Sequence, residues 1–202
     1  MLPKLALDLD GTLADLHSVI LPEVSAETGK VITANMITSW KALARYTGKS
    51  SEGWRYEQVW DKYKDRVEVI QPYERGLDRL TERLGKVAEV DIVTAHEEGS
   101  REPISEWLGL YGVKYRELVI VPLKSNKEEL CRHGIFVDDS DSLARRIQEK
   151  QRVRRVTGDQ ERLLECFLYD QPYNRGIENG NGVSRVRSLL EVVEILEGRA
   201  EA

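Results

Sequence analysis

The hydrophobic pattern of the chain changes period repeatedly, from short apolar runs to helical spacing and back. Residues 4–9 alternate and then run apolar up to an Asp-Gly pair, which is typical of a short buried strand followed by a turn. Further strands are predicted at residues 87–93, 118–121 and 135–137. Helices are predicted between and after them at residues 74–84, 103–110, 126–133 and 141–150. Strands that alternate with helices in this way favour a parallel sheet with crossover helices.

The segment between the first strand and residue 73 follows a different pattern. It shows helical spacing from residue 14 to about residue 30 and in two more stretches between residues 33 and about 63, and it contains no convincing strand. We therefore expect an α/β fold, a doubly wound parallel sheet of the Rossmann-like type, with a small helical cap inserted after the first strand. The expected core comprises residues 1–13 and 73–202, and the expected cap comprises residues 14–72.

The C-terminal third gives a less regular pattern. Residues 152–156 and 166–169 are both strand candidates, and only one of them need belong to the main sheet. Residues 170–183 are rich in Pro, Asn and Gly and predict a loop, followed by an amphipathic helix from residue 185 to about 196. In doubly wound sheets ligands bind beyond the carboxyl ends of the strands, so we expect functional residues at the strand ends.

Composition narrows the class of partner. A chain of 202 residues with 41% hydrophobic content suits one core domain plus a sizeable insertion. Its net charge of −5 provides no positive field for a nucleic acid polymer or an anionic membrane, so an anionic substrate must be held by local donors or a metal. Two cysteines are too few for a disulfide framework, and no apolar run approaches the length of a signal or membrane-spanning segment. We expect a cytoplasmic protein whose partner is neither a nucleic acid polymer nor a membrane.

Two carboxylates, Asp8 and Asp10, stand two residues apart at the end of the first predicted strand. Side chains at this spacing in an extended chain point to the same face, so both can converge on one site. The two negative charges repel each other unless a cation lies between the carboxylates or one of them is protonated. Gly11 gives the following turn its conformational freedom. Taken alone, an acidic pair ahead of a glycine is also ordinary turn chemistry.

Phosphate-binding groups are predicted at two further places. Thr94 ends a predicted strand, where its hydroxyl and nearby backbone N–H groups such as that of Ala95 can cradle phosphate oxygens. Lys127 opens a predicted helix, with Lys124 three residues earlier, and either ammonium can neutralise a phosphoryl group. A single lysine is more often a solvated surface residue, so the choice between the two stays open.

A fourth element is the run Ile-Phe-Val-Asp-Asp, in which three apolar residues lead to Asp138 and Asp139. Two adjacent carboxylates at the end of a buried strand make electrostatic sense if a hard cation takes oxygen ligands there.

The four elements together, in this order, resemble the motifs of the haloacid dehalogenase-like (HAD) hydrolase superfamily over about residues 4–141. The resemblance implies a magnesium-dependent phosphatase in which Asp8 is the nucleophile and forms an aspartyl-phosphate. It implies that Asp10 is the general acid and then the general base. It also implies that magnesium is held by Asp8, the main-chain carbonyl of Asp10 and Asp138, with Asp139 as an orienting residue or an alternative ligand. Thr94, Ala95 and Lys127, or Lys124 in its place, would bind the phosphoryl group.

A narrower resemblance lies at residues 169–175, Tyr-Asp-Gln-Pro-Tyr-Asn-Arg, which a basic and apolar helix follows. This stretch is similar to the C-terminal segment of the 5′(3′)-deoxyribonucleotidase-type branch and its uncharacterised bacterial and phage relatives. It implies a 5′-nucleotidase that acts on (deoxy)nucleoside monophosphates. The alternatives are a phosphatase for sugar or other small phosphates and a non-catalytic HAD-fold binding module, and residues 172–174 can also be read as a simple turn.

Candidate substrate contacts come mainly from the aromatic residues of the insertion, whose rings can stack on a nucleobase or can simply pack the cap onto itself. His17 and His96 are open to the same two readings, as substrate contacts or as ordinary surface residues. The candidates are Trp40, Trp54, Trp60 and, near the C-terminus, Arg175.

Overall fold

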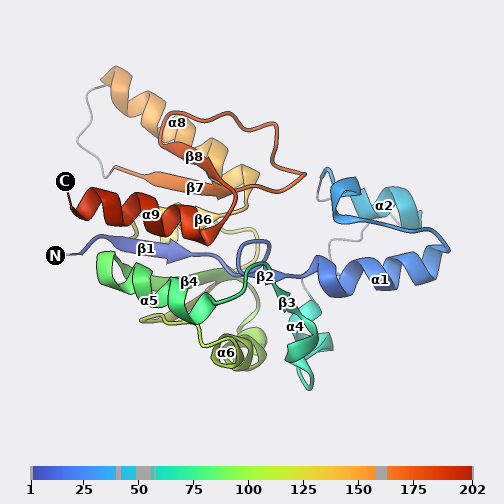
Figure 1. The fold of residues 1–202 in the computed structure, drawn as a ribbon. Helices are drawn as coiled ribbons and strands as arrows, with labels where there is room; N and C mark the ends of the chain where they lie inside the picture. The colour runs from blue at the N-terminus through green and yellow to red at the C-terminus, as the bar shows by residue number, and fades with distance from the viewer. Residues whose placement is uncertain (1, 40–41, 49–55, 57, 158–162, 202) are drawn as a thin grey trace.

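The computed structural model describes residues 2–39, 42–48, 56, 58–157 and 163–201 (Figure 1). Its main sheet has six strands in the order β5-β4-β1-β6-β7-β8, and every neighbouring pair is parallel. The strands are β1 (Lys4–Leu7), β4 (Glu89–Ala95), β5 (Leu118–Val121), β6 (Ile135–Asp138), β7 (Glu165–Tyr169) and β8 (Val183–Val186). The predicted α/β fold with a Rossmann-like parallel sheet is confirmed.

Strand β1 lies in the middle of the sheet because its side chains are apolar on both faces. Leu5 and Leu7 pack into one hydrophobic cluster and Ala6 into another, and all three are almost fully buried. Because no water reaches such a strand, its backbone groups must be hydrogen-bonded at both edges, and β4 and β6 provide these partners. The carboxyl end of β1 is therefore surrounded by the ends of other parallel strands.

Helices cover both faces of the sheet, as a doubly wound fold requires. On the face of Leu5 and Leu7 the cluster includes apolar residues of α5 (Leu77–Val87), α6 (Arg101–Leu110) and α9 (Leu189–Ala200). On the face of Ala6 it includes residues of α8 (Asp141–Thr157). The short helix α7 (Lys127–Leu130) lies between β5 and β6 in the chain. It begins one residue later and ends three residues earlier than predicted.

Among the described residues of the segment between β1 and α5, the regular elements are helices apart from one short ladder. The strands β2 (Ala14–Asp15) and β3 (Gln71–Pro72) pair antiparallel at its two ends. Between them lie α1 (His17–Thr28), η1 (Ala34–Met36), α2 (Ala42–Thr47), α4 (Val59–Lys62) and η2 (Val67–Val69). Figure 1 shows α1 and α2 extending away from the carboxyl ends of the sheet. The division of the chain into a core and a cap, with boundaries at residues 13 and 73, stays a prediction.

The C-terminal third differs locally from its predicted pattern. Of the two strand candidates, residues 166–169 lie in β7, whereas residues 152–156 belong to the end of α8, whose Val153 and Val156 face solvent. Where a loop and the start of a helix are predicted after β7, the structure has a sixth strand, β8, which pairs with β7 at the edge of the sheet. The following helix begins only at Leu189, because the hydroxyl of Ser188 accepts a hydrogen bond from the Glu191 N–H and caps it.

The predicted helix from residue 14 also begins late, at His17, because Ala14 and Asp15 form the ladder with β3 instead. Helix α5 continues through Gly85 to Val87, and η3 (Glu98–Ser100) precedes α6. None of the helices in the described part of the chain combines the length and apolar character needed to cross a bilayer.

Candidate active site

The carboxyl end of β1 opens onto a cavity of about 500 Å³, and both Asp8 and Asp10 line it. Asp8 continues the ladder beyond the strand, since its N–H donates to the Val137 carbonyl oxygen at 2.9 Å. The chain then turns sharply at Gly11, which has a φ of +76°. Strand and turn together present the two carboxylates to one space, as their spacing predicts.

Lys127 contacts two of the carboxylates at this site directly. Its Nζ lies 2.6 Å from Asp8 Oδ1 and 2.9 Å from Asp138 Oδ2. Burial lowers the pKa of Lys127, but Asp138 and Asp8 outweigh it and raise that pKa above its ordinary value, so the ammonium is charged at neutral pH. Lys124 also lines the cavity but is exposed and has a φ of +64°. Contact with the Asp8 carboxylate thus distinguishes Lys127 from Lys124.

Three buried carboxylates, those of Asp8, Asp138 and Asp139, present oxygen atoms within 4.8 Å of one another. Burial, followed by the charge of Asp138, raises the pKa of Asp8 to about 7, and burial likewise raises the pKa of Asp139. Lys127 supplies one positive charge against three carboxylates, so the cluster is short of positive charge when all three are ionised. An oxygen-rich, electron-rich cluster of this kind fits a hard divalent cation such as magnesium.

Asp10 is held at both of its carboxylate oxygens. The indole N–H of Trp60 donates to Oδ1 at 2.9 Å, and Nε2 of His96 lies 2.6 Å from Oδ2. Burial lowers the pKa of His96, but the charge of Asp10 outweighs burial and raises it. Trp60 comes from α4 in the insertion and His96 follows β4, so two distant parts of the chain fix the orientation of one carboxylate.

The remaining predicted phosphate-binding residues also lie at the cavity. Thr94 is buried and Ala95 half-buried, and both line it at the end of β4. The structure therefore brings Asp8, Thr94, Lys127 and Asp138 to one place from four elements. Their carboxyl-end location is the one that parallel α/β sheets provide for ligands.

The predicted substrate contacts are distributed differently. Trp60 is fully buried and does not line the cavity, so its ring is not exposed to a ligand, in agreement with the packing alternative. Arg175 is exposed and 3.9 Å from Asp170, away from the cavity lining. Trp40 and Trp54 lie outside the described residues.

The cavity has an aromatic wall that the sequence indicated only in part. Tyr56, Tyr73 and Tyr173 line it together with Leu16 and His17, and His17 Nε2 is 3.1 Å from the Tyr56 hydroxyl. Tyr56 is one of the aromatic residues of the insertion and His17 was a candidate contact, whereas Tyr73 was not predicted. Tyr73 and Tyr173 lie beyond the insertion, in segments where turn residues dominate the sequence pattern. The Tyr-Asp-Gln-Pro-Tyr-Asn-Arg stretch was the one available signal for Tyr173.

Comparison with known proteins supports the fold. No family model and no curated protein matches the chain. Among solved structures it is similar to a putative haloacid dehalogenase-like hydrolase from Burkholderia xenovorans LB400, with a TM-score of 0.55 and 16% identity over 96% of this chain and 97% of that one. It is also similar to the putative HAD-hydrolase YfnB from Bacillus subtilis, whose structure has magnesium bound, with a TM-score of 0.53 and 14% identity over 96% and 98% of the two chains.

A HAD phosphatase from Thermococcus onnurineus gives a TM-score of 0.50 and 17% identity over 98% of this chain and 99% of that one. The three likenesses span nearly the whole of each chain and show that this protein has the fold of HAD-like hydrolases.

Proposed function

We propose that this protein is a magnesium-dependent phosphomonoester hydrolase that works through an aspartyl-phosphate on Asp8. One observation carries the proposal: Asp8 lies in a cavity with its carboxylate 2.6 Å from the ammonium of Lys127, while Asp10, two residues on, is oriented at both oxygens. A nucleophile beside a fixed cation and a separately held acid–base group is the arrangement that covalent phosphoryl transfer needs.

In the first half-reaction, an Asp8 oxygen attacks phosphorus and the bond from phosphorus to the ester oxygen breaks. Asp10 gives its proton to the departing oxygen, so the leaving group departs as an alcohol. In the second half-reaction, Asp10 takes a proton from water as the water oxygen attacks phosphorus. The bond to Asp8 then breaks and inorganic phosphate is released. One carboxylate serves both steps because the proton that it loses in the first is regained in the second.

The phosphoryl oxygens need donors in this scheme. We assign that role to the Thr94 hydroxyl, the Ala95 N–H and the Lys127 ammonium, all of which come from the cavity lining. Magnesium would be held by Asp8, Asp138 and the main-chain carbonyl of Asp10, with Asp139 as a further ligand or an orienting group. When bound, it supplies positive charge that offsets the repulsion between the carboxylates and an anionic substrate.

For the substrate we propose a nucleoside monophosphate, preferably a deoxynucleotide. The cavity of about 500 Å³ has room for a base and a sugar, and its wall of Tyr56, Tyr73 and Tyr173 offers aromatic surface to a planar group. The net charge of −5 supports a small phosphorylated molecule over a nucleic acid polymer. A sugar phosphatase would use the same core residues, and substrate preference separates the two.

The test is phosphate release from deoxynucleoside monophosphates, nucleoside monophosphates and sugar phosphates, each with magnesium and with EDTA. Magnesium-dependent release that is fastest with deoxynucleotides would support the whole proposal. Release from sugar phosphates alone would retain the mechanism and overturn the nucleotidase assignment. No release from any compound would favour a non-catalytic binding module with the same fold.

A further inference from the structure

The segment between β7 and β8 is much more buried than an ordinary surface loop. Gln171 is 4% exposed and Asn174 is 1% exposed, although the surrounding sequence is rich in Pro, Asn and Gly. Buried amide side chains must find hydrogen-bond partners, and the partners that these two find lie at the candidate active site.

Three side chains of this segment reach the ends of two other strands. The Gln171 Nε2 donates to the Gly11 carbonyl oxygen at 2.7 Å, next to Asp10. The Asn174 Nδ2 donates to the Asp139 carbonyl oxygen at 2.8 Å, and the Tyr173 hydroxyl donates to the Asp139 carboxylate. Main chain and side chain of Asp139 are thus held separately.

Asn174 uses its full hydrogen-bonding capacity. Its Nδ2 also donates to the Tyr169 carbonyl oxygen at 2.8 Å, and its Oδ1 accepts from the Gln171 N–H at 3.1 Å and from Arg185 Nη1 at 2.7 Å. An amide has two donor hydrogens and one doubly accepting oxygen, so no other side chain makes the same four contacts in this space.

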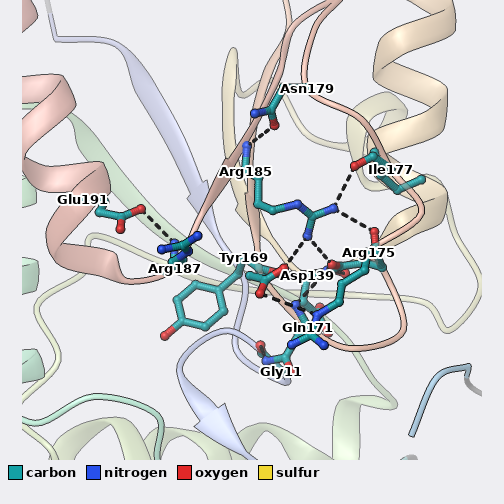
Figure 2. A network of polar contacts seen from close by, with 12 residues as sticks. Gly11, Asp139, Tyr169, Gln171, Arg175, Ile177, Asn179, Arg185, Arg187 and Glu191 are labelled. Atoms are coloured by element: carbon teal, nitrogen blue, oxygen red, sulfur yellow. Dashed lines mark hydrogen bonds and ion pairs between the residues drawn. The ribbon is translucent and has the colours of Figure 1, made fainter. Parts of the chain in front are cut away.

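Arg185, on β8, ties the segment to the sheet, as Figure 2 shows. Its guanidinium donates to the Asp170 carboxylate at 2.7 Å, to the Asn174 carbonyl oxygen at 2.9 Å and to the Ile177 carbonyl oxygen at 2.8 Å. Planar, multidentate contacts of this kind restrict orientation as well as distance.

The two strand ends that this segment contacts also lie close to each other. A side-chain carbon built on Gly11 would overlap the Asp139 carboxylate and approach the Tyr173 hydroxyl. The turn after β1 therefore leaves Asp139 no room to move toward Gly11.

We infer that residues 171–174, locked by Arg185, are positioning residues that set the metal affinity of the Asp8, Asp138 and Asp139 cluster. The inference rests on the proposed function, since it takes this cluster as the magnesium site. Hydrogen bonds behind metal ligands fix ligand orientation before the metal arrives, and their loss typically weakens metal binding without removing a ligand.

The test measures Mn²⁺ affinity of the full-length, metal-free protein by electron paramagnetic resonance, with Mg²⁺ as competitor. Asn174→Ala removes the support of the Asp139 main chain, and Tyr173→Phe removes only the hydroxyl that meets its carboxylate. Each is expected to raise the Mn²⁺ Kd by about 10- to 100-fold. The matched control is Asn179→Ala, because the Asn179 amide accepts from the Arg185 N–H but does not reach Asp139, and its Kd should equal that of the parent protein.

Circular dichroism and thermal melting establish that each variant is folded. If Asn174→Ala does not fold, Tyr173→Phe decides the outcome. Parent-like affinity in the folded variants, with Mn²⁺ bound by the parent protein, would overturn the positioning role alone. If the parent protein itself binds no Mn²⁺, both the metal site and this inference are wrong.

Discussion

At the residue scale, the carboxylates of the site differ in the groups that surround them, which suits them to different chemical roles. Asp8 lies against the ammonium of Lys127 in a buried ionic cluster, whereas Asp10 accepts a hydrogen bond from the indole N–H of Trp60 and lies beside His96, whose pKa it raises. In the proposed mechanism the nucleophile is thus the carboxylate beside a fixed lysine, and the acid–base group is the carboxylate beside an indole and a titratable imidazole. The geometry therefore gives the two carboxylates different partners, which the sequence does not show.

Replacing Asp8 tests its proposed role as the nucleophile. Asp8→Asn should reduce phosphate release below detection, because an amide oxygen does not attack phosphorus, and the fold should be retained because the side chain keeps its volume. Asp61→Asn is the control, since Asp61 is an exposed carboxylate on α4 whose ion pair is with Lys64. Retained turnover in Asp8→Asn, measured together with its melting curve, would remove the nucleophile assignment.

The Trp60 hydrogen bond tests the second role. A hydrogen bond to a charged group contributes about 1.5–3 kcal/mol, so Trp60→Phe should lower kcat by roughly 10- to 100-fold with little change in KM. The proposed role of Asp10 is to protonate the leaving group, so kcat/KM should fall more for an alkyl phosphate than for 4-nitrophenyl phosphate, whose leaving group departs without a proton.

Trp107→Phe provides a closely matched control. Trp107 is also fully buried, its ring centroid is 6.0 Å from that of Trp60, and its indole N–H donates to the Ile70 carbonyl oxygen at 2.8 Å. It should lose stability without a preference for either leaving group. An equal loss of kcat/KM for both esters in Trp60→Phe would show that its role is structural.

At the scale of elements, the turn after β1 is the tightest constraint on the site. Gly11 has a φ of +76°, and the Asp139 carboxylate occupies the place that a side chain at Gly11 would need, so there is both a backbone and a packing reason for glycine. The short helix α7 has a simpler task, which is to deliver Lys127 to the same place. Each element thus contributes one group and a precise direction for it.

Gly11→Ala and Gly29→Ala separate these two reasons. Gly29 has a φ of +66°, and a methyl group there meets no atom within 4 Å, so its substitution should cost only the left-handed backbone strain of about 1–2 kcal/mol. Gly11→Ala adds an overlap with Asp139 and should cost more and also abolish phosphate release. Urea unfolding of both variants provides the measurement, and equal losses of stability would contradict the packing argument.

At the scale of the whole molecule, charged networks join segments that are distant in sequence. Asp91, buried on β4, accepts from Arg116 Nε at 2.9 Å and is 2.8 Å from His133 Nε2. Burial opposes ionisation of Asp91, but the hydrogen bonds from Arg116 and His133 outweigh it and lower its pKa. The network holds together the loops that precede β5 and β6, away from the cavity lining.

A lowered carboxyl pKa makes stability depend on pH in one direction. The unfolded chain has the ordinary Asp pKa of about 3.9, so this contribution is complete above that pH and is lost as the pH falls toward the lower pKa of the folded protein. Urea midpoints of the parent protein and Arg116→Gln should therefore differ most at neutral pH and converge below about pH 4. Arg132→Gln, at an exposed arginine nearby, should show no such convergence. A gap that stays constant with pH would contradict the assignment.

The sequence by itself determined the fold class and the set of polar groups at the strand ends. Buried parallel strands are nearly continuous apolar runs, so β1, β5 and β6 could be located within a few residues, and the carboxyl-end rule then placed Asp8, Thr94 and Asp138 near one another. These features are local or follow from topology. They do not depend on how any one side chain packs.

Only the tertiary structure decided which distant partners those groups have. Strand β8 and the short β2–β3 ladder depend on pairing with remote segments, and so their few residues carry no period of their own. From the sequence, Trp60 could stack on a ligand or pack within the cap. Its hydrogen bond to Asp10, 50 positions earlier in the sequence, could not be predicted from the local pattern. Likewise the Pro-Tyr-Asn stretch could be read as a simple turn, but in the structure the Asn174 amide donates to the Asp139 carbonyl oxygen. A buried amide must find a hydrogen-bond partner, and the fold decides which one is near.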